Sequence, residues 1–269
     1  MSDVFIVDSH CHLDFPDFAG EHAALLDRAD AAGVKLMVTI STRVSRLEGL
    51  LALTRAHERI YATVGTHPNS AAEEPDVPVE TLVRLSADPK IVGIGEAGLD
   101  FHYDSAPPDV QEAVFRRHIA AARQTGLPLV VHARDADAEM ERILTEESAT
   151  GAFPFLLHCF SSGRRLADVG VELGGYVSFS GILTFNRSEE IRAIAAALPA
   201  ERILVETDAP YLAPPPWRGK RNEPAYTRKT VEVLAQTRGV SLDEIATLTS
   251  DNFFRLFSKT PDPRGAART

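Results

Sequence analysis

The amino-acid sequence predicts an α/β fold, namely a single (β/α)8 TIM barrel. Its length of 269 residues agrees with the ~250 residues that one barrel of this type usually occupies. Short apolar runs rich in β-formers recur along the chain, and segments with helical patterns lie between them. Because strands that alternate with helices predict a parallel sheet, we favour the closed barrel over an open, doubly wound sheet.

The predicted strands are the apolar runs at Val4–Val7, Lys35–Ile40, Ile60–Val64, Ile91–Ile94, Leu129–Val131, Phe153–Leu157, Tyr176–Phe179 and Ile203–Val205. Segments between them carry polar residues on one side and Ala or Leu on the other, which indicates helices. Examples are Glu21–Ala32, Arg43–His57, Asp109–Gln124, Ala136–Glu147 and Glu189–Ala197. Glycine is a typical helix stop, and it precedes the second, fifth and seventh runs at Gly33, Gly126 and Gly174.

The last helix is marked at its start, where Ser241 and Glu244 form a capping-box pattern. A broad apolar side then runs from Leu242 to Phe257. No repeat or linker indicates a second domain, so we expect residues 1–260 to form one domain. Residues 261–269, which contain Pro and Gly, are expected to form a flexible tail.

The composition, with 44% hydrophobic and 25% charged residues, is that of an ordinary globular protein. The sequence has neither a run of the ~20 apolar residues that cross a bilayer nor a basic leader, so we expect a cytoplasmic protein without membrane contact. Cys11 and Cys159 are the two cysteines, and we expect them to remain free thiols. The net charge of −10 excludes a general basic surface for nucleic acid, so any such binding must be local and could depend on bound cations.

Polar residues follow the predicted strands at their C-terminal ends, where barrels of this type carry their chemistry. Possible metal ligands follow five of the strands, at His10, His12, Glu96, His132, His158 and Asp208. Strand alternation places His10 and His12 on one face, ~7 Å apart at their Cα atoms, and points Cys11 into the barrel wall. Buried, hydrogen-bonded side chains would explain any one of these residues but not all six. Four imidazoles and two carboxylates suffice for two divalent cations, with Glu96 as the bridge.

A lysine carbamate is an alternative bridge between two metal ions. Lys90 precedes the fourth predicted strand and therefore lies at the wrong end of it, whereas Glu96 follows that strand. A carboxylate bridge is the better interpretation.

The sequence resembles the TatD family of metal-dependent deoxyribonucleases from residue 4 to about residue 257. The order and spacing of the matching motifs are specific, although each motif is short. They are His10–His12, Gly95–Asp100, His132–Arg134, His158–Ser161, Glu206–Tyr211, Arg218–Pro224 and Asn252–Phe257. The resemblance implies a barrel of the amidohydrolase type that holds two metal ions.

By position, the resemblance implies that His10, His12, Glu96 and Asp208 hold the first ion, and that Glu96, His132 and His158 hold the second. The histidines favour Zn²⁺, whereas carboxylates and phosphate also accommodate Mg²⁺ or Mn²⁺. The family usually has Gly-x-His-Pro-His after the third strand, but here the sequence is Gly65–Asn69. Asn69 leaves the ligand set intact and removes any role that needs a charge or a proton at that position.

The predicted reaction is hydrolysis of a phosphodiester bond by a water held between the two ions. The catalytic residues are Asp208, which would orient this water and take its proton, and Glu96, which would set the metal spacing. Candidate donors to the substrate phosphate are His67, Arg134, Ser161, Arg221 and Asn222. Tyr211 and Trp217 follow the eighth strand and either stack on a terminal base or pack within the protein.

The function predicted first is therefore a metal-dependent hydrolase, a deoxyribonuclease that acts as an exonuclease on DNA ends or single strands. The expected partner is DNA, and no obligate protein partner is evident. The first alternative is that the same centre cleaves ester, amide or aminoacyl-tRNA bonds. The second is a non-catalytic, metal-binding adaptor, which the complete ligand set disfavours.

Overall fold

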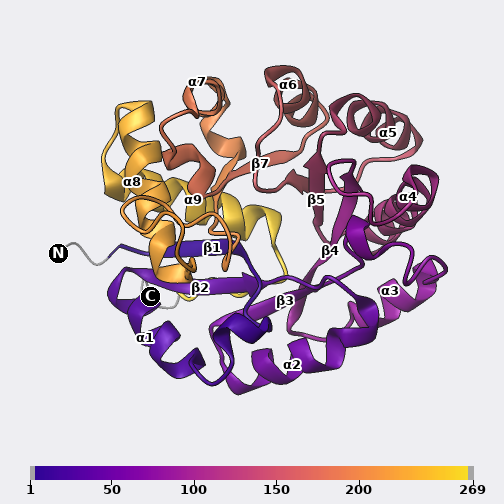
Figure 1. Ribbon diagram of the computed structural model, residues 1–269, viewed down its shortest axis with the longest axis horizontal. Coiled ribbons are helices and arrows are strands. Elements are labelled where there is room, and N and C mark those ends of the chain that lie inside the picture. The colour runs from indigo at the N-terminus through magenta and orange to yellow at the C-terminus, as the bar shows by residue number, and fades with distance from the viewer. Residues whose placement is uncertain (1–3, 266–269) are drawn as a thin grey trace.

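The computed structural model describes residues 4–265, which form eight parallel strands in a nearly closed barrel with helices around it (Figure 1). The predicted (β/α)8 fold is confirmed. Each strand pairs with the next along the chain. The strands are β1 (Ile6–Cys11), β2 (Val34–Thr39), β3 (Ile60–Val64), β4 (Ile91–Asp100), β5 (Leu129–Arg134), β6 (Phe155–Leu157), β7 (Tyr176–Phe179) and β8 (Ile203–Val205).

The helices form the outer layer and connect successive strands. They are α1 (His22–Ala31), α2 (Leu47–Ala56), α3 (Val79–Leu85), α4 (Pro108–Thr125), α5 (Asp137–Thr150), α6 (Arg164–Glu172), α7 (Glu189–Ala197), α8 (Thr227–Arg238) and α9 (Leu242–Leu256). Short 3-10 helices lie at Pro16–Phe18, Val44–Arg46, Pro68–Ser70, Gly181–Thr184, Ala200–Arg202 and Pro224–Tyr226. The predicted capping box of α9 is present, since Ser241 and Glu244 each accept a backbone N–H of the other.

The barrel closes where β8 meets β1. Cys11 and Ala209 form a parallel bridge, and two backbone hydrogen bonds flank it. The Asp208 N–H donates to the His10 carbonyl at 2.9 Å, and the His12 N–H donates to the Ala209 carbonyl at 2.8 Å. The C-terminal ends of the first and last strands are therefore adjacent.

One end of the barrel is filled by α9. Phe253, Leu256 and Phe257 of this helix form one buried cluster with residues near the beginnings of the strands, such as Val7 and Val92. A larger buried cluster packs the strands against the surrounding helices. The C-terminal ends of the strands are left for polar side chains.

Strand β4 is longer than the sequence predicts, because it continues past Ile94 to Asp100. Gly95 and Gly98 have φ values of 110° and 153°, a region that favours glycine. A Cβ atom on Gly98 would lie 2.0 Å from the His132 carbonyl oxygen. These glycines bring β4 close to β5 and place Glu96 within the strand rather than after it.

None of the helices within residues 4–265 is long and apolar enough to cross a membrane. Both cysteines are free, as predicted. In the expected tail, Arg264 pairs with Asp251 and Asp262, whereas residues 266–269 lie outside the described part of the chain. The domain division therefore stays a prediction.

Candidate metal centre

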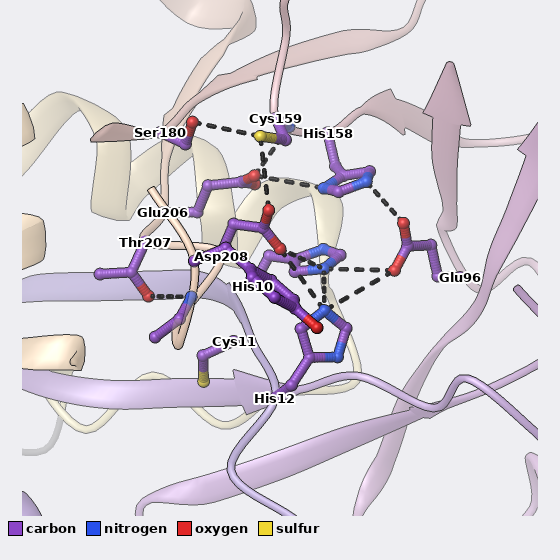
Figure 2. Close-up of polar contacts among 12 residues, drawn as sticks. His10, Cys11, His12, Glu96, His158, Cys159, Ser180, Glu206, Thr207 and Asp208 are labelled. Atoms are coloured by element: carbon purple, nitrogen blue, oxygen red, sulfur yellow. Dashed lines mark hydrogen bonds and ion pairs between the residues drawn. The ribbon is translucent and has the colours of Figure 1, made fainter. Parts of the chain in front are cut away.

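The six predicted ligands converge at the C-terminal ends of the strands. Figure 2 shows five of them, namely His10, His12, Glu96, His158 and Asp208. In one group, the Nε2 atoms of His10 and His12 lie 3.3 Å apart. Glu96 Oε2 lies 3.3 Å from His10 Nε2, and Asp208 Oδ1 lies 3.4 Å from His12 Nε2 and 3.6 Å from His10 Nε2. The Cys11 thiol points away and donates to the Val38 carbonyl, so it is not part of the group.

A second group surrounds the other oxygen of Glu96. Its Oε1 lies 2.7 Å from His158 Nε2 and 2.8 Å from His132 Nδ1. These two nitrogens lie 3.3 Å from each other. Glu96 therefore directs one carboxylate oxygen toward each group, which is the arrangement required of a bridging ligand.

The first group has the dimensions of a metal site. Four ligands at the usual zinc bond length of ~2.0–2.1 Å lie about 3.3 Å apart in a tetrahedron, which is close to the separations just given, whereas His12 Nε2 and Glu96 Oε2 lie 4.0 Å apart. Glu96 Oε2 is also buried and makes no hydrogen bond within the described part of the chain. A cation bound beside it would satisfy this oxygen.

The charges of the centre attract cations. Burial opposes ionisation of Glu96, but the imidazoles of His158, His67 and His10 outweigh it and hold the pKa of Glu96 well below its usual range. Burial likewise disfavours a proton on His158, but the carboxylates of Glu96 and Glu206 raise its pKa well above the ordinary value. For His12, a hydrogen bond and the charge from Asp208 outweigh burial and raise the pKa. In both cases the carboxylates of the centre favour a positive charge on the neighbouring imidazole.

Two further carboxylates, which the sequence analysis did not assign to the site, orient the histidines. Glu206 Oε1 lies 3.2 Å from His158 Nδ1 and accepts the Cys159 backbone N–H at 2.7 Å. Asp100 Oδ2 lies 3.1 Å from His132 Nε2. Metal-binding histidines usually donate their second nitrogen to such a group. Both residues stand in the motifs quoted above, and the need of each ligand histidine for an acceptor was the signal that could have identified them.

His67 lies beside the second group but has the geometry of a donor. Its Nδ1 accepts the Asn69 backbone N–H at 3.0 Å, and burial lowers its pKa to about 3. The neutral ring therefore carries its proton on Nε2, which lies 3.4 Å from Glu96 Oε1. Asn69 donates its own amide to Asp100 at 3.3 Å, so the residue that departs from the family pattern supports the Asp100–His132 pair.

Arg134 and Ser161, both predicted to bind phosphate, line one cleft of about 660 Å³. None of the six candidate ligands lines this cleft, but Arg134 lies two residues beyond His132 on β5, and Ser161 lies three residues beyond His158. The Arg134 guanidinium lies over the Tyr103 ring, 4.9 Å from its centroid. It has no carboxylate partner among residues 4–265, so its N–H donors are available.

The other two predicted substrate-binding residues, Arg221 and Asn222, interact with residues of the protein itself. Arg221 pairs with Glu21 at 2.8 Å. Asn222 is buried, and its amide donates to the carbonyls of Thr207 and Tyr211. Neither contacts the six clustered residues, so their assignment stays a prediction without a supporting contact.

Comparison with known proteins identifies relatives along almost the whole chain. The family model described as "TatD related DNase" matches residues 7–258. An uncharacterized metal-dependent hydrolase of Escherichia coli, YcfH, is 40% identical over 94% of this chain and 96% of its own. The protein named 3′-5′ ssDNA/RNA exonuclease TatD of Enterobacter lignolyticus is 34% identical over 93% and 98%. The crystal structure of YjjV, a TatD homologue from Escherichia coli, superposes with a TM-score of 0.88 at 31% identity, covering 95% of this chain and 98% of that one.

Replacing Glu206 by Ala removes the acceptor that orients His158, so the affinity for Zn²⁺ or Mn²⁺ should fall about 10- to 100-fold. Glu206→Gln keeps a side-chain oxygen and should therefore lose less of the metal affinity. Competition with a chelating dye measures both affinities, and Glu201→Ala, at an exposed position, is the control. Equal affinities for the wild type and Glu206→Ala would contradict this positioning role.

His118 supports the loop that carries His67, and this support should weaken in acid. His118 Nε2 accepts the Thr66 N–H at 3.0 Å, and burial lowers its pKa to about 4 from the ordinary value of 6.5. Below pH 6.5 the unfolded chain binds a proton that the folded chain excludes. The free energy of unfolding therefore decreases as the pH is lowered. When the pH is lowered from 7 to 4, the free energy of unfolding of wild type should decrease by about 3 kcal/mol relative to that of His118→Gln.

Urea unfolding at several pH values within this range measures the difference. The histidines of the centre are present in both proteins, so their titration cancels. Parallel stability profiles for the two proteins would show that His118 is not held neutral in the fold.

Proposed function

The chain belongs to the family of TatD-related DNases, and from this membership we propose that it is a metal-dependent nuclease acting on DNA ends or single strands. The observation that carries the proposal is the division of the Glu96 oxygens between two groups of ligands. The two groups would hold two cations beside Glu96, and a pair of cations would supply charge stabilisation for in-line displacement at a phosphodiester. The relative named as a single-strand exonuclease supports the substrate class.

The proposed ligands are His10, His12, Glu96 and Asp208 for one ion, and Glu96, His132 and His158 for the other. The imidazoles favour Zn²⁺, and the carboxylates also accept Mg²⁺ or Mn²⁺. When bound, such ions supply Lewis acidity at phosphate and make water more acidic.

Asp208 is the carboxylate placed to accept the proton of the attacking water. Its side chain is 15% exposed, whereas those of Glu96 and Glu206 are 2% and 0% exposed. Burial disfavours its charge, but the hydrogen bond with His12 and the charge of His10 outweigh burial and lower the pKa of Asp208. It is therefore an ionised base at neutral pH and the one that solvent reaches. Glu96 is sequestered and fixes the two groups relative to each other.

The substrate phosphates are held by neutral and cationic donors beside the centre. The Nε2–H of His67 faces the Glu96 side of the centre, and Arg134 and Ser161 line one cleft. A guanidinium can donate two parallel hydrogen bonds to one phosphate. We assign Arg134 to a phosphate of the bound strand, next to the one that is cleaved.

The direct test is cleavage of 5′-labelled and 3′-labelled single-stranded oligonucleotides by wild type and Glu96→Ala, with and without Mg²⁺, Mn²⁺ or Zn²⁺. We expect metal-dependent cleavage that Glu96→Ala abolishes, because both ligand groups lose their shared carboxylate. The labels show from which end digestion proceeds. Circular dichroism of Glu96→Ala and Glu96→Gln verifies that the variants are folded.

Absence of cleavage with every metal, in a wild-type protein that binds two ions, would contradict the nuclease proposal. Ester, amide and aminoacyl-tRNA substrates would then be tested on the same centre.

Replacing Arg134 by Ala should raise KM for a single-stranded oligonucleotide about 10-fold, because a charge-assisted phosphate contact is lost. The number of metal ions bound should not change, since Arg134 contacts none of the ligands. Steady-state kinetics measures the effect, and Arg165→Ala, a surface arginine paired with Glu141, is the control. A KM equal to that of wild type would remove Arg134 from the substrate site.

A further inference from the structure

Two of the exposed large hydrophobic side chains belong to tyrosines beside the metal centre. Tyr103 and Tyr211 are 49% and 53% exposed, and they follow β4 and β8 at the open end of the barrel. Neither hydroxyl makes a hydrogen bond to any residue from 4 to 265. By contrast, Trp217 lies flat on Tyr226, with ring centroids 3.9 Å apart, and so packs within the protein.

Tyr211 lies on the His12 side of the centre. Its backbone N–H donates to the Asp208 carbonyl at 2.9 Å, and its ring lies 6.4 Å from that of His12. Phe15 stacks on His12 at 4.7 Å and meets the Tyr211 ring edge-on at 6.2 Å. The His12 imidazole and the rings of Phe15 and Tyr211 therefore form a continuous aromatic surface.

Tyr103 lies on the other side, next to the second group. Its backbone N–H donates to Asp100 Oδ1 at 3.2 Å, and Asp100 in turn contacts His132. The Arg134 guanidinium covers part of its ring.

We propose that Tyr211 and Tyr103 are base-stacking platforms on opposite sides of the metal centre. This inference rests on the proposed nuclease function. A strand whose scissile phosphodiester lies at the centre places the nucleobase on one side of that bond on Tyr211 and the nucleobase on the other side on Tyr103. For removal of single nucleotides, these are the terminal and the penultimate base.

Stacking suits this protein for a physical reason. Proteins that bind single strands usually combine aromatic stacking with a basic groove, but the net charge here is −10, and Arg134 shares its cleft with Asp135, Asp137 and Glu139. Aromatic faces supply affinity that phosphate contacts alone do not. Bases inside a duplex are already stacked, so the platforms select unpaired ends without reading sequence.

The test combines tyrosine variants with oligonucleotides that lack one base. Wild type should cleave a strand with an abasic terminal or penultimate nucleotide about 10-fold less efficiently, in kcat/KM, than an intact strand. In Tyr211→Ala, an abasic nucleotide at one of the two positions should no longer reduce kcat/KM, whereas one at the other position still should. In Tyr103→Ala, the two positions should exchange these effects. Tyr211→Phe and Tyr103→Phe, which keep the ring, should behave as wild type.

A strand abasic at both positions provides the matched control, because wild type and both alanine variants should cleave it at equal rates. Val240→Ala, the third exposed hydrophobic side chain, controls for surface change. The proposal is overturned if both alanine variants keep both penalties, or if they cleave the doubly abasic strand more slowly than wild type. If wild type cleaves no intact strand, both the nuclease function and the base-stacking role are contradicted. If wild type cleaves intact and abasic strands equally well, only the base-stacking role is contradicted.

Discussion

The candidate centre depends on the closure of the barrel between β8 and β1. The hydrogen bonds across this seam include those from Asp208 to His10 and from His12 to Ala209, and two from the Thr207 N–H and hydroxyl to the buried Asp8 carboxylate. Three of the four proposed ligands of the first ion lie directly on it. A shift of one residue between these strands would move Asp208 away from His10 and His12. The geometry of the centre is therefore set by backbone pairing before any metal binds.

Glu96 connects this seam to the opposite wall. A carboxylate that is 2% exposed is expensive to bury unless opposite charges or hydrogen-bond donors surround it. Imidazoles from β1, β3, β5 and β6 ends provide that environment, and the close packing of Gly98 against β5 brings β4 near enough for it. The two carboxylates differ in exposure, since the Glu96 side chain is 2% exposed and that of Asp208 is 15% exposed, and this difference is the basis of the separate roles proposed for them.

The fold and the convergence of the six candidate residues could be predicted because parallel strands bring their C-terminal ends together, so residues far apart in sequence become neighbours. The direction of each side chain was harder to predict. Glu206 and Asp208 are two residues apart, yet Asp208 has a left-handed φ of 57°, which breaks strand alternation. Glu206 faces His158, whereas Asp208 faces His10 and His12. The burial of Asn222 by its own loop could not be predicted either, because no local sequence pattern indicates it.

The molecule divides its work between strands and loops. The strands hold His10, Glu96 and His132 in positions that the barrel fixes, and such a centre does not by itself distinguish one hydrolysable bond from another. Selection of a substrate must then come from the loops above the centre, where side chains are free to vary without disturbing the core. Tyr103 and Tyr211 lie in these loops with half-exposed rings, and Arg134, at the end of β5, has no carboxylate partner among residues 4–265. Their flat rings and single cation match a flexible, unpaired strand better than a rigid duplex, whose faces are stacked and whose recognition requires many cations.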